Sequence, residues 1–235
     1  MWTSRKGIFV VIDGNDGSGK ATQTRLLAEY LTAQSVPFEK MDFPRYGVGV
    51  FGNLVGDALA GKHGDFLHLD PNIASTLYAL DRFEATPTLE HALKSGKVVI
   101  ADRFSSSNQI HQGGKIADET KRKTFLGWLD NMEHEVLGIP RPDVQIYLHV
   151  PLELSVKLLS EKRSVKNAAL QEGQKDTVEE DTEYLERSHA TAKWISEREA
   201  GWRTVECAPG GSLRSPEDIH AEVVQIVEEA RTMVQ

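Results

Sequence analysis

The sequence predicts an α/β protein in which a mostly parallel sheet of about five strands carries helices on both faces. Short β-rich apolar runs alternate with segments of helical period, which is typical of parallel strands joined by crossover helices. A glycine-rich loop also joins the first apolar run to the first helical segment. A chain of 235 residues corresponds to one or two domains, and we expect one, over residues 1–235.

The apolar runs predict five strands, at residues 7–13, 36–41, 97–101, 144–150 and 202–207. The helix after the first strand has apolar side chains on one face, namely Leu26, Leu27, Tyr30 and Leu31. Asp70 is a suitable N-cap for a helix that Pro71 opens and that runs towards Lys94. Further helices are expected over 118–137, from Pro151 onward and over 216–233. Ligands bind such sheets beyond the carboxyl ends of the strands, so we expect the chemistry there.

Composition excludes several classes of protein. The chain has 27 Lys+Arg against 35 Asp+Glu, a net charge of −8, whereas binding of polymeric nucleic acid needs basic surfaces. The single cysteine, Cys207, excludes a disulfide framework and is typical of a reducing compartment. No apolar run approaches the ~20 residues of a membrane span, and Asp13 follows too early for a secretory signal. We expect a cytoplasmic globular protein with neither nucleic-acid polymer nor membrane as partner.

The segment after the first strand has the spacing of a phosphate-binding loop. Residues 14–20 follow the G-x-x-x-x-G-K pattern, Walker A, between a strand and a helix as its mechanism requires. Glycines let successive N–H groups face one anion, the helix N-terminus adds positive potential, and a lysine reaches the β- and γ-phosphates. A chance glycine turn is the alternative. The residues expected to bind ATP here are Gly14, Asn15, Asp16, Gly17, Ser18, Gly19, Lys20, Ala21 and Thr22.

Ala21 departs from this pattern, because a Ser or Thr hydroxyl normally binds Mg²⁺ at that position. Mg²⁺ is then expected to depend on carboxylates, waters and the nucleotide, which are its usual ligands. Asp102, at the tip of the third strand, and Asp16 are the carboxylates expected to hold it. Arg103 can clamp phosphate oxygens, although a surface ion pair with Asp102 is the alternative.

Three further groups of side chains lie near the same edge of the predicted sheet. Phe43-Pro44-Arg45-Tyr46 follows the second strand, where a catalytic loop is expected. Tyr78 and Arg82 share one helix face, so a ring and a guanidinium could meet a nucleobase, but the pattern alone favours a core tyrosine and a surface arginine. Ser107-Asn108 supplies an amide, whose donor and acceptor can read a pyrimidine edge.

Residues 161–180 are almost wholly polar, with Lys162, Arg163, Lys166 and Lys175 among acids and amides. Such a run is usually a solvated loop. Beside a phosphate-binding loop it also fits a mobile lid that brings cations over a phosphate.

Together these residues resemble the thymidylate kinase family, the nucleoside-monophosphate kinases that phosphorylate dTMP. The resemblance runs from Gly7 to about Ile226. Its carriers are Asp13 through Gln23, Phe43-Pro44-Arg45-Tyr46-Gly47, Tyr78-Ala79-Leu80-Asp81-Arg82, Asp102-Arg103-Phe104 with Ser107-Asn108, and Lys175 to Leu185. It implies a three-layer P-loop NTPase-type fold with a mobile lid. It also implies transfer of the γ-phosphoryl group of ATP to dTMP, which gives dTDP and ADP on the route to dTTP.

The resemblance also assigns roles. Asp16 meets the sugar 3′-hydroxyl, Tyr78 stacks under thymine, and Arg82 and Asn108 read the base. Arg45 and Arg103 hold the acceptor phosphate, and Asp102 lies near Mg²⁺ and the attacking phosphate. His111 takes a usually aromatic position beside the sugar. The implied catalytic residues are Lys20, Arg103, Asp102, Arg45 and Asp16, and the implied dTMP-binding residues are Asp16, Phe43, Pro44, Arg45, Tyr78, Arg82, Arg103, Ser107, Asn108 and His111.

Members of the family differ in the source of one catalytic cation, which is either an Arg in the P-loop or a residue of the lid. Gly17 takes the P-loop position here, so the chain resembles the lid-supplying, bacterial-like type. Arg163 matches the Arg that packs on the adenine of ATP, and Lys166 and Lys175 are candidates for the cation. The family also implies a homodimer, in which Trp128 belongs either to the interface or to the core.

Three other functions remain to be distinguished from this one. Another nucleoside-monophosphate kinase would share the fold and the P-loop, but adenylate kinases favour a Pro that residues 14–20 lack. A deoxynucleoside kinase would need a base after the first strand, and Asp13 could be read that way. A non-catalytic nucleotide sensor would explain Ala21, but the intact Arg45, Asp102 and Arg103 argue against it.

Overall fold

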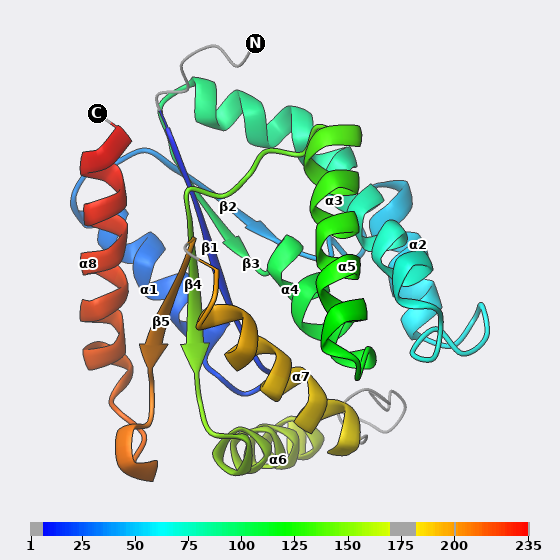
Figure 1. Ribbon diagram of the computed structural model, residues 1–235. Coiled ribbons are helices and arrows are strands. Elements are labelled where there is room, and N and C mark those ends of the chain that lie inside the picture. Colours follow the sequence, from blue (N-terminus) through cyan, green and yellow to red (C-terminus); the bar gives the residue numbers. More distant parts are fainter. Residues whose placement is uncertain (1–6, 170–181, 200, 235) are drawn as a thin grey trace.

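The computed structural model describes residues 7–169, 182–199 and 201–234 (Figure 1). The elements in chain order are β1 (Ile8–Gly14), α1 (Lys20–Ala33), β2 (Phe38–Asp42), α2 (Gly49–Leu59), α3 (Pro71–Lys94), β3 (Val98–Asp102), α4 (Ser105–His111), η1 (Gly113–Lys115), α5 (Glu119–Asp130), η2 (Asn131–Val136), β4 (Val144–His149), α6 (Leu152–Ala169), α7 (Thr182–Ser196), β5 (Trp202–Glu206), η4 (Pro209–Gly211) and α8 (Pro216–Val234).

The five strands form one parallel sheet, as the alternation of runs predicted, and their order in the sheet is β2-β3-β1-β4-β5. The register places Asp102 level with Asp42 on one neighbouring strand and with Ile12 on the other. The carboxyl ends of β1, β2 and β3 therefore meet at one edge of the sheet. This edge carries the glycine-rich loop and the segments that follow β2 and β3.

Alternate side chains of the central strand β1 build the two halves of the core. Ile8, Val10 and Ile12 are buried in a cluster with apolar residues of α1 and α8, which lie on one side of the sheet (Figure 1). Phe9 and Val11 are buried in a second cluster with residues of α3, on the opposite side. Because both faces are covered, the central strands read as continuous apolar runs rather than as alternating ones.

Helix α3 spans the residues that its start and stop signals predict. The side chain of Asp70 accepts hydrogen bonds from the backbone N–H groups of Asn72 and Ile73, and Pro71 occupies the first helical position. Gly96 follows the end of the helix with a φ of +78°. These caps fix the direction of α3, which presents Tyr78, Asp81 and Arg82 to the functional edge of the sheet.

Several predicted boundaries were wrong. The second strand was predicted over 36–41 but begins at Phe38, because Pro37 has no N–H to donate to a neighbouring strand. The helix predicted over 118–137 is α5 followed by the wider π-helical turn η2, which points Glu133 into the core. The lid predicted over 161–180 stays a prediction: the backbone of residues 161–169 belongs to α6, and residues 170–180 lie outside the described residues.

Helices α2, α4 and α7 were not predicted. Two of them lack the usual signals of a helix. Helix α2 is rich in glycine, and α4 has only 7 residues and opens with three serines, and both residue types are weak helix formers. Cys207 is buried just beyond β5. Among the described residues, none of the helices combines the length and the apolar character that crossing a membrane requires.

Candidate active site

The glycine-rich loop connects β1 to α1, and its backbone needs glycine. Gly17 has a φ of +83°, and a Cβ atom there would lie 2.6 Å from the carbonyl oxygen of Ser155 on α6. Gly19, with a φ of +90°, is the N-cap of α1. The Asn15 amide atoms and Ser18 Oγ are buried without a hydrogen-bond partner among the described residues. Unpartnered polar atoms at a helix N-terminus suit an anion such as a phosphate.

Lys20 is the first residue of α1, and its side chain curls back under the loop. Its Nζ donates to the carbonyl oxygens of Gly14 at 2.8 Å and Asn15 at 3.0 Å. The Asp16 carboxylate lies 3.7 Å away. Burial, together with the nearby Arg103, lowers the pKa of Lys20 to about 8. The ammonium group is thus held against the loop backbone with little water around it, where its attraction for a phosphate is strong.

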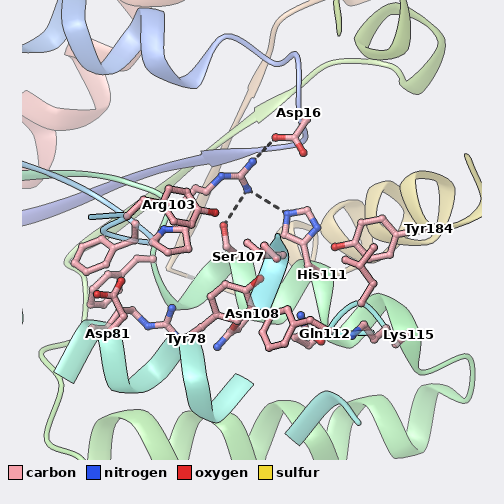
Figure 2. Close-up of a pocket in the computed structure, with 18 residues that line it drawn as sticks. Asp16, Tyr78, Asp81, Arg103, Ser107, Asn108, His111, Gln112, Lys115 and Tyr184 are labelled. Carbon is pink, nitrogen blue, oxygen red and sulfur yellow. Dashed lines mark hydrogen bonds and ion pairs between the residues drawn. The ribbon is translucent and has the colours of Figure 1, made fainter. Parts of the chain in front are cut away.

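Arg103 links this loop to the segment after β3 (Figure 2). Its guanidinium pairs with the Asp16 carboxylate and donates to Ser107 Oγ at 3.3 Å. Its backbone has a φ of +66°, an uncommon conformation for a residue with a side chain. Burial opposes ionisation of Asp16, but Arg103 and Lys20 outweigh it and hold the pKa of Asp16 well below its usual range. A fixed, charged triad therefore spans the two segments.

The Asp13 carboxylate already accepts hydrogen bonds from three neighbouring groups. Its carboxylate accepts hydrogen bonds from the Ser106 and Ser107 hydroxyls at 2.6 and 2.8 Å and from the N–H of Gly14. These contacts fasten α4 to the end of β1. They also leave the carboxylate little capacity to act as a base, which argues against the deoxynucleoside kinase alternative.

His111 lies beside Arg103 at the end of α4. Its Nε2 is 3.1 Å from an Arg103 nitrogen, which donates to it, and its ring stacks on Tyr184 of α7 with centroids 5.8 Å apart. Burial and the Arg103 charge lower the pKa of His111 to about 4. The imidazole is therefore neutral at physiological pH, which it must be in order to accept from a guanidinium.

This neutral histidine should make stability depend on pH. The unfolded chain binds a proton at His111 below a pKa of 6.5, whereas the folded chain does so only near 4, so folding loses stability as pH falls between these values. We expect the free energy of unfolding to fall by about 2 kcal/mol more between pH 7 and pH 5 in the native chain than in His111→Gln. Urea titrations at the two pH values measure it. His63→Gln, at an exposed histidine, is the control, and equal losses in the native chain and His111→Gln would contradict the prediction.

A cavity of about 280 Å³ opens next to Arg103, between α3, α4 and the segment after β2 (Figure 2). All but one of the residues predicted to bind dTMP line it: Asp16, Phe43, Pro44, Tyr78, Arg82, Arg103, Ser107, Asn108 and His111. Four further lining residues lie within the sequence motifs but were given no role: Tyr46, Asp81, Phe104 and Tyr184. The remaining ones, Leu59, Phe66, Leu67, Gln112 and Lys115, lie outside those motifs, so the sequence did not point to them.

Arg45 is the predicted residue that does not line the cavity. Its Nε donates to Asp81 Oδ1 at 2.9 Å, and its Nη2 lies 3.3 Å from the Glu84 carboxylate. Glu84 also accepts from the backbone N–H groups of Val50 and Phe51. In this structure Arg45 thus fastens the segment after β2 and the start of α2 to α3, beside the cavity wall rather than in it.

Tyr78 and Arg82 do share one face of α3, as their spacing predicted, but Arg82 is no surface residue. It is 3% exposed, and its Nε and Nη2 donate to the two carboxylate oxygens of Glu133 at 2.8 and 2.6 Å. Burial raises the pKa of Tyr78, so its hydroxyl stays protonated. The Tyr78 ring and Asn108 both reach the cavity, where a flat heterocycle could lie between them.

Asp102 suits a hard cation better than the other carboxylates of the site. Its carboxylate makes no hydrogen bond to a described residue, and burial raises its pKa while Lys20 and Arg103 oppose that rise. Asp16 is engaged by Arg103. The described residues contain no cluster of three His, Cys, Asp or Glu side chains that could hold a metal. The site therefore fits an ion held by one carboxylate, waters and a nucleotide, as is usual for Mg²⁺.

Three residues predicted for the donor side cannot be placed. The side chains of Arg163 and Lys166, whose backbone belongs to α6, and the whole of Lys175 lie outside the described residues. Ala21 and Thr22 follow Lys20 in the first turn of α1.

Comparison with known proteins agrees with this geometry. The model of a family described as thymidylate kinase matches residues 12–209. The thymidylate kinase of Mycobacterium tuberculosis H37Rv is 32% identical over 196 residues, 83% of this chain and 87% of that protein. A probable thymidylate kinase of Thermococcus onnurineus is 32% identical over 228 residues, 94% of this chain and 97% of that protein. The solved thymidylate kinase structure from Candida albicans, at 20% identity, covers 97% of this chain and 95% of its own with a TM-score of 0.69, which confirms the fold.

Proposed function

The chain belongs to the thymidylate kinase family, and we propose from this premise that it transfers the γ-phosphoryl group of ATP to dTMP. One observation supports the proposal most directly. The Arg103–Asp16 contact joins the phosphate-binding loop to the cavity, so a donor nucleotide on the loop and an acceptor in the cavity would meet at Arg103. Products of the reaction are dTDP and ADP, and the reaction feeds dTTP synthesis.

Catalysis in this geometry consists of positioning and neutralisation of charge. The acceptor phosphate is already an anion, so no strong base is required, in agreement with the saturated Asp13. Lys20 neutralises the β- and γ-phosphates of the donor, and Arg103 holds the acceptor phosphate in line with it. We assign Arg45 to the acceptor phosphate as well, which requires its guanidinium to leave Asp81 when the substrate binds.

Within the cavity we assign the sugar to Asp16 and His111 and the base to Tyr78, Arg82 and Asn108. Phe43, Pro44 and Ser107 complete its wall. Mg²⁺, when bound, withdraws charge from the transferring phosphoryl group, and Asp102 is the residue we assign to it, with Asp16 as a second candidate. The backbone groups of residues 14–22 cradle the donor phosphates.

A lid cation is proposed because Gly17 takes the P-loop position at which other family members carry an arginine. A Cβ atom at Gly17 would lie 2.6 Å from the carbonyl oxygen of Ser155, so a side chain there would require α6 or the loop to shift. We assign the missing charge to Lys166 or Lys175, on a lid over about 161–180, and the adenine contact to Arg163. We further propose that residues 1–235 form one kinase domain and that the protein is a cytoplasmic homodimer, whose mass sedimentation equilibrium would measure.

The proposal is tested by ADP release with Mg²⁺ and ATP against dTMP, dUMP, dCMP, dGMP, AMP and thymidine. We expect fast turnover with dTMP, slower turnover with dUMP, because one methyl group is worth about 1–3 kcal/mol, and no turnover when EDTA removes the metal. Preference for another monophosphate would overturn the assigned base-reading residues. Turnover with thymidine would favour a deoxynucleoside kinase, and no turnover despite ATP binding would favour a sensor.

A further inference from the structure

Glu133 is a fully buried carboxylate that no sequence pattern brought forward. It is 0% exposed and lies on the π-helical turn η2, directly after α5. Its two oxygens accept hydrogen bonds from Nε and Nη2 of Arg82, so the carboxylate holds one edge of the guanidinium at two points. A buried carboxylate is costly unless all its acceptor sites are used, so the question is what else it holds.

The third donor to Glu133 is Asn108. Its Nδ2 lies 3.3 Å from Glu133 Oε1 and 3.1 Å from the carbonyl oxygen of Ser75. A carboxylate and a backbone carbonyl can only accept hydrogen bonds, so both N–H groups of the amide are directed at them. Oδ1 accepts no hydrogen bond from a described residue, and Asn108 lines the cavity. The amide can therefore present only its acceptor to a ligand.

Glu133 likewise limits which hydrogen-bonding group Arg82 can present to a ligand. With Nε and Nη2 on Glu133, its Nη1 is the nitrogen that has no hydrogen-bond partner among the described residues, and Arg82 also lines the cavity. The Cζ atom of Arg82 additionally lies over the Phe104 ring, 5.6 Å from its centroid. One buried carboxylate thus turns an acceptor and a donor towards the same space.

We propose that Glu133 is the positioning residue that sets which pyrimidine the cavity accepts, an inference that rests on the proposed function. An acceptor beside a donor matches the N3–H and the neighbouring carbonyl of thymine or uracil. Cytosine presents the reverse pattern, an unprotonated N3 beside an amino group, and would place acceptor against acceptor and donor against donor. Such unpaired buried groups are rejected strongly.

The test compares Glu133→Gln with Glu135→Gln, the same change two residues away on η2, where the side chain is 64% exposed and pairs with Arg141. In Glu133→Gln the new amide brings an N–H group that lets Asn108 rotate and present its own N–H groups to the cavity. We expect KM for dTMP to rise about tenfold with kcat within about threefold of native, and the kcat/KM preference for dTMP over dCMP to fall at least about tenfold. Glu135→Gln should match the native chain.

Glu133→Asp keeps the charge that balances Arg82 and so secures a folded protein for the test. Its carboxylate is one methylene shorter and cannot reach both partners, so KM for dTMP and the selectivity should move in the same direction by at least about threefold. Circular dichroism establishes that each variant is folded. A folded Glu133→Asp with native KM and selectivity, or a uniform loss of kcat with every acceptor, would overturn the role of Glu133. A native chain that phosphorylates no pyrimidine monophosphate would instead overturn the proposed function.

Discussion

Replacing Lys20 by alanine is expected to lower kcat by about a thousandfold or more without unfolding the protein. The ammonium group is a buried charge of the phosphate-binding loop, and the loop backbone fixes its position through the carbonyl oxygens of Gly14 and Asn15. A preorganised charge in a site that excludes water contributes several kcal/mol to transition-state stabilisation. Steady-state kinetics with saturating ATP and dTMP measure the effect.

The Lys20→Ala variant should be as stable as the native chain or more stable. Burial lowers the pKa of Lys20 to about 8, which means that the folded chain holds this charge at a cost. Alanine removes the cost and is a good first residue for α1. Thermal unfolding should therefore occur at the native temperature or above it. Lys94→Ala, an exposed lysine paired with Glu90, is the control, and a Lys20→Ala enzyme with more than a tenth of native kcat would contradict the assignment.

The fold could be predicted because its signals are local. Apolar runs mark the buried strands, and Asp70 with Pro71 and Gly96 marks both ends of α3. The π-helical turn η2 could not be predicted, since residues 118–137 have a helical period throughout. This turn carries Glu133, which pairs with Arg82, 51 residues away in the chain, and a local sequence pattern does not reveal such a pairing.

The candidate site likewise contains residues that local motifs locate and residues whose positions depend on tertiary packing. The phosphate-binding loop and the Asp102-Arg103 step follow strands directly, so their spacing located them. Arg45 was recognisable, but its pairing with Asp81 and Glu84 depends on how α2 and α3 pack. A glutamate on an amphipathic helix normally faces solvent, so nothing in the sequence distinguishes the buried Glu133 from the exposed Glu135.

Replacing Arg103 by lysine is expected to lower kcat by about a hundredfold, although the charge is kept. The guanidinium meets Asp16, Ser107 and His111 at once, and a lysine ammonium is a point charge that cannot span them. Arginine and lysine are equally disfavoured at the φ of +66° of residue 103. A change in kcat therefore reports on the geometry of the guanidinium and not on the backbone. Single-turnover kinetics with bound ATP and dTMP measure the chemical step, and Arg203→Lys, at an exposed ion pair on β5, is the control.

A double-mutant cycle with Asp16→Asn separates alignment from simple neutralisation of phosphate charge. If Arg103 acts from a position that Asp16 fixes, Asp16→Asn should cost much less in kcat when residue 103 is already lysine, because the alignment is lost once. Independent costs, multiplying to within about twofold, would mean that Arg103 and Asp16 act separately on the two nucleotides. A kcat within threefold of native for Arg103→Lys would contradict the proposed role of the guanidinium in aligning the two nucleotides. Its charge alone would then suffice at the point where donor and acceptor meet.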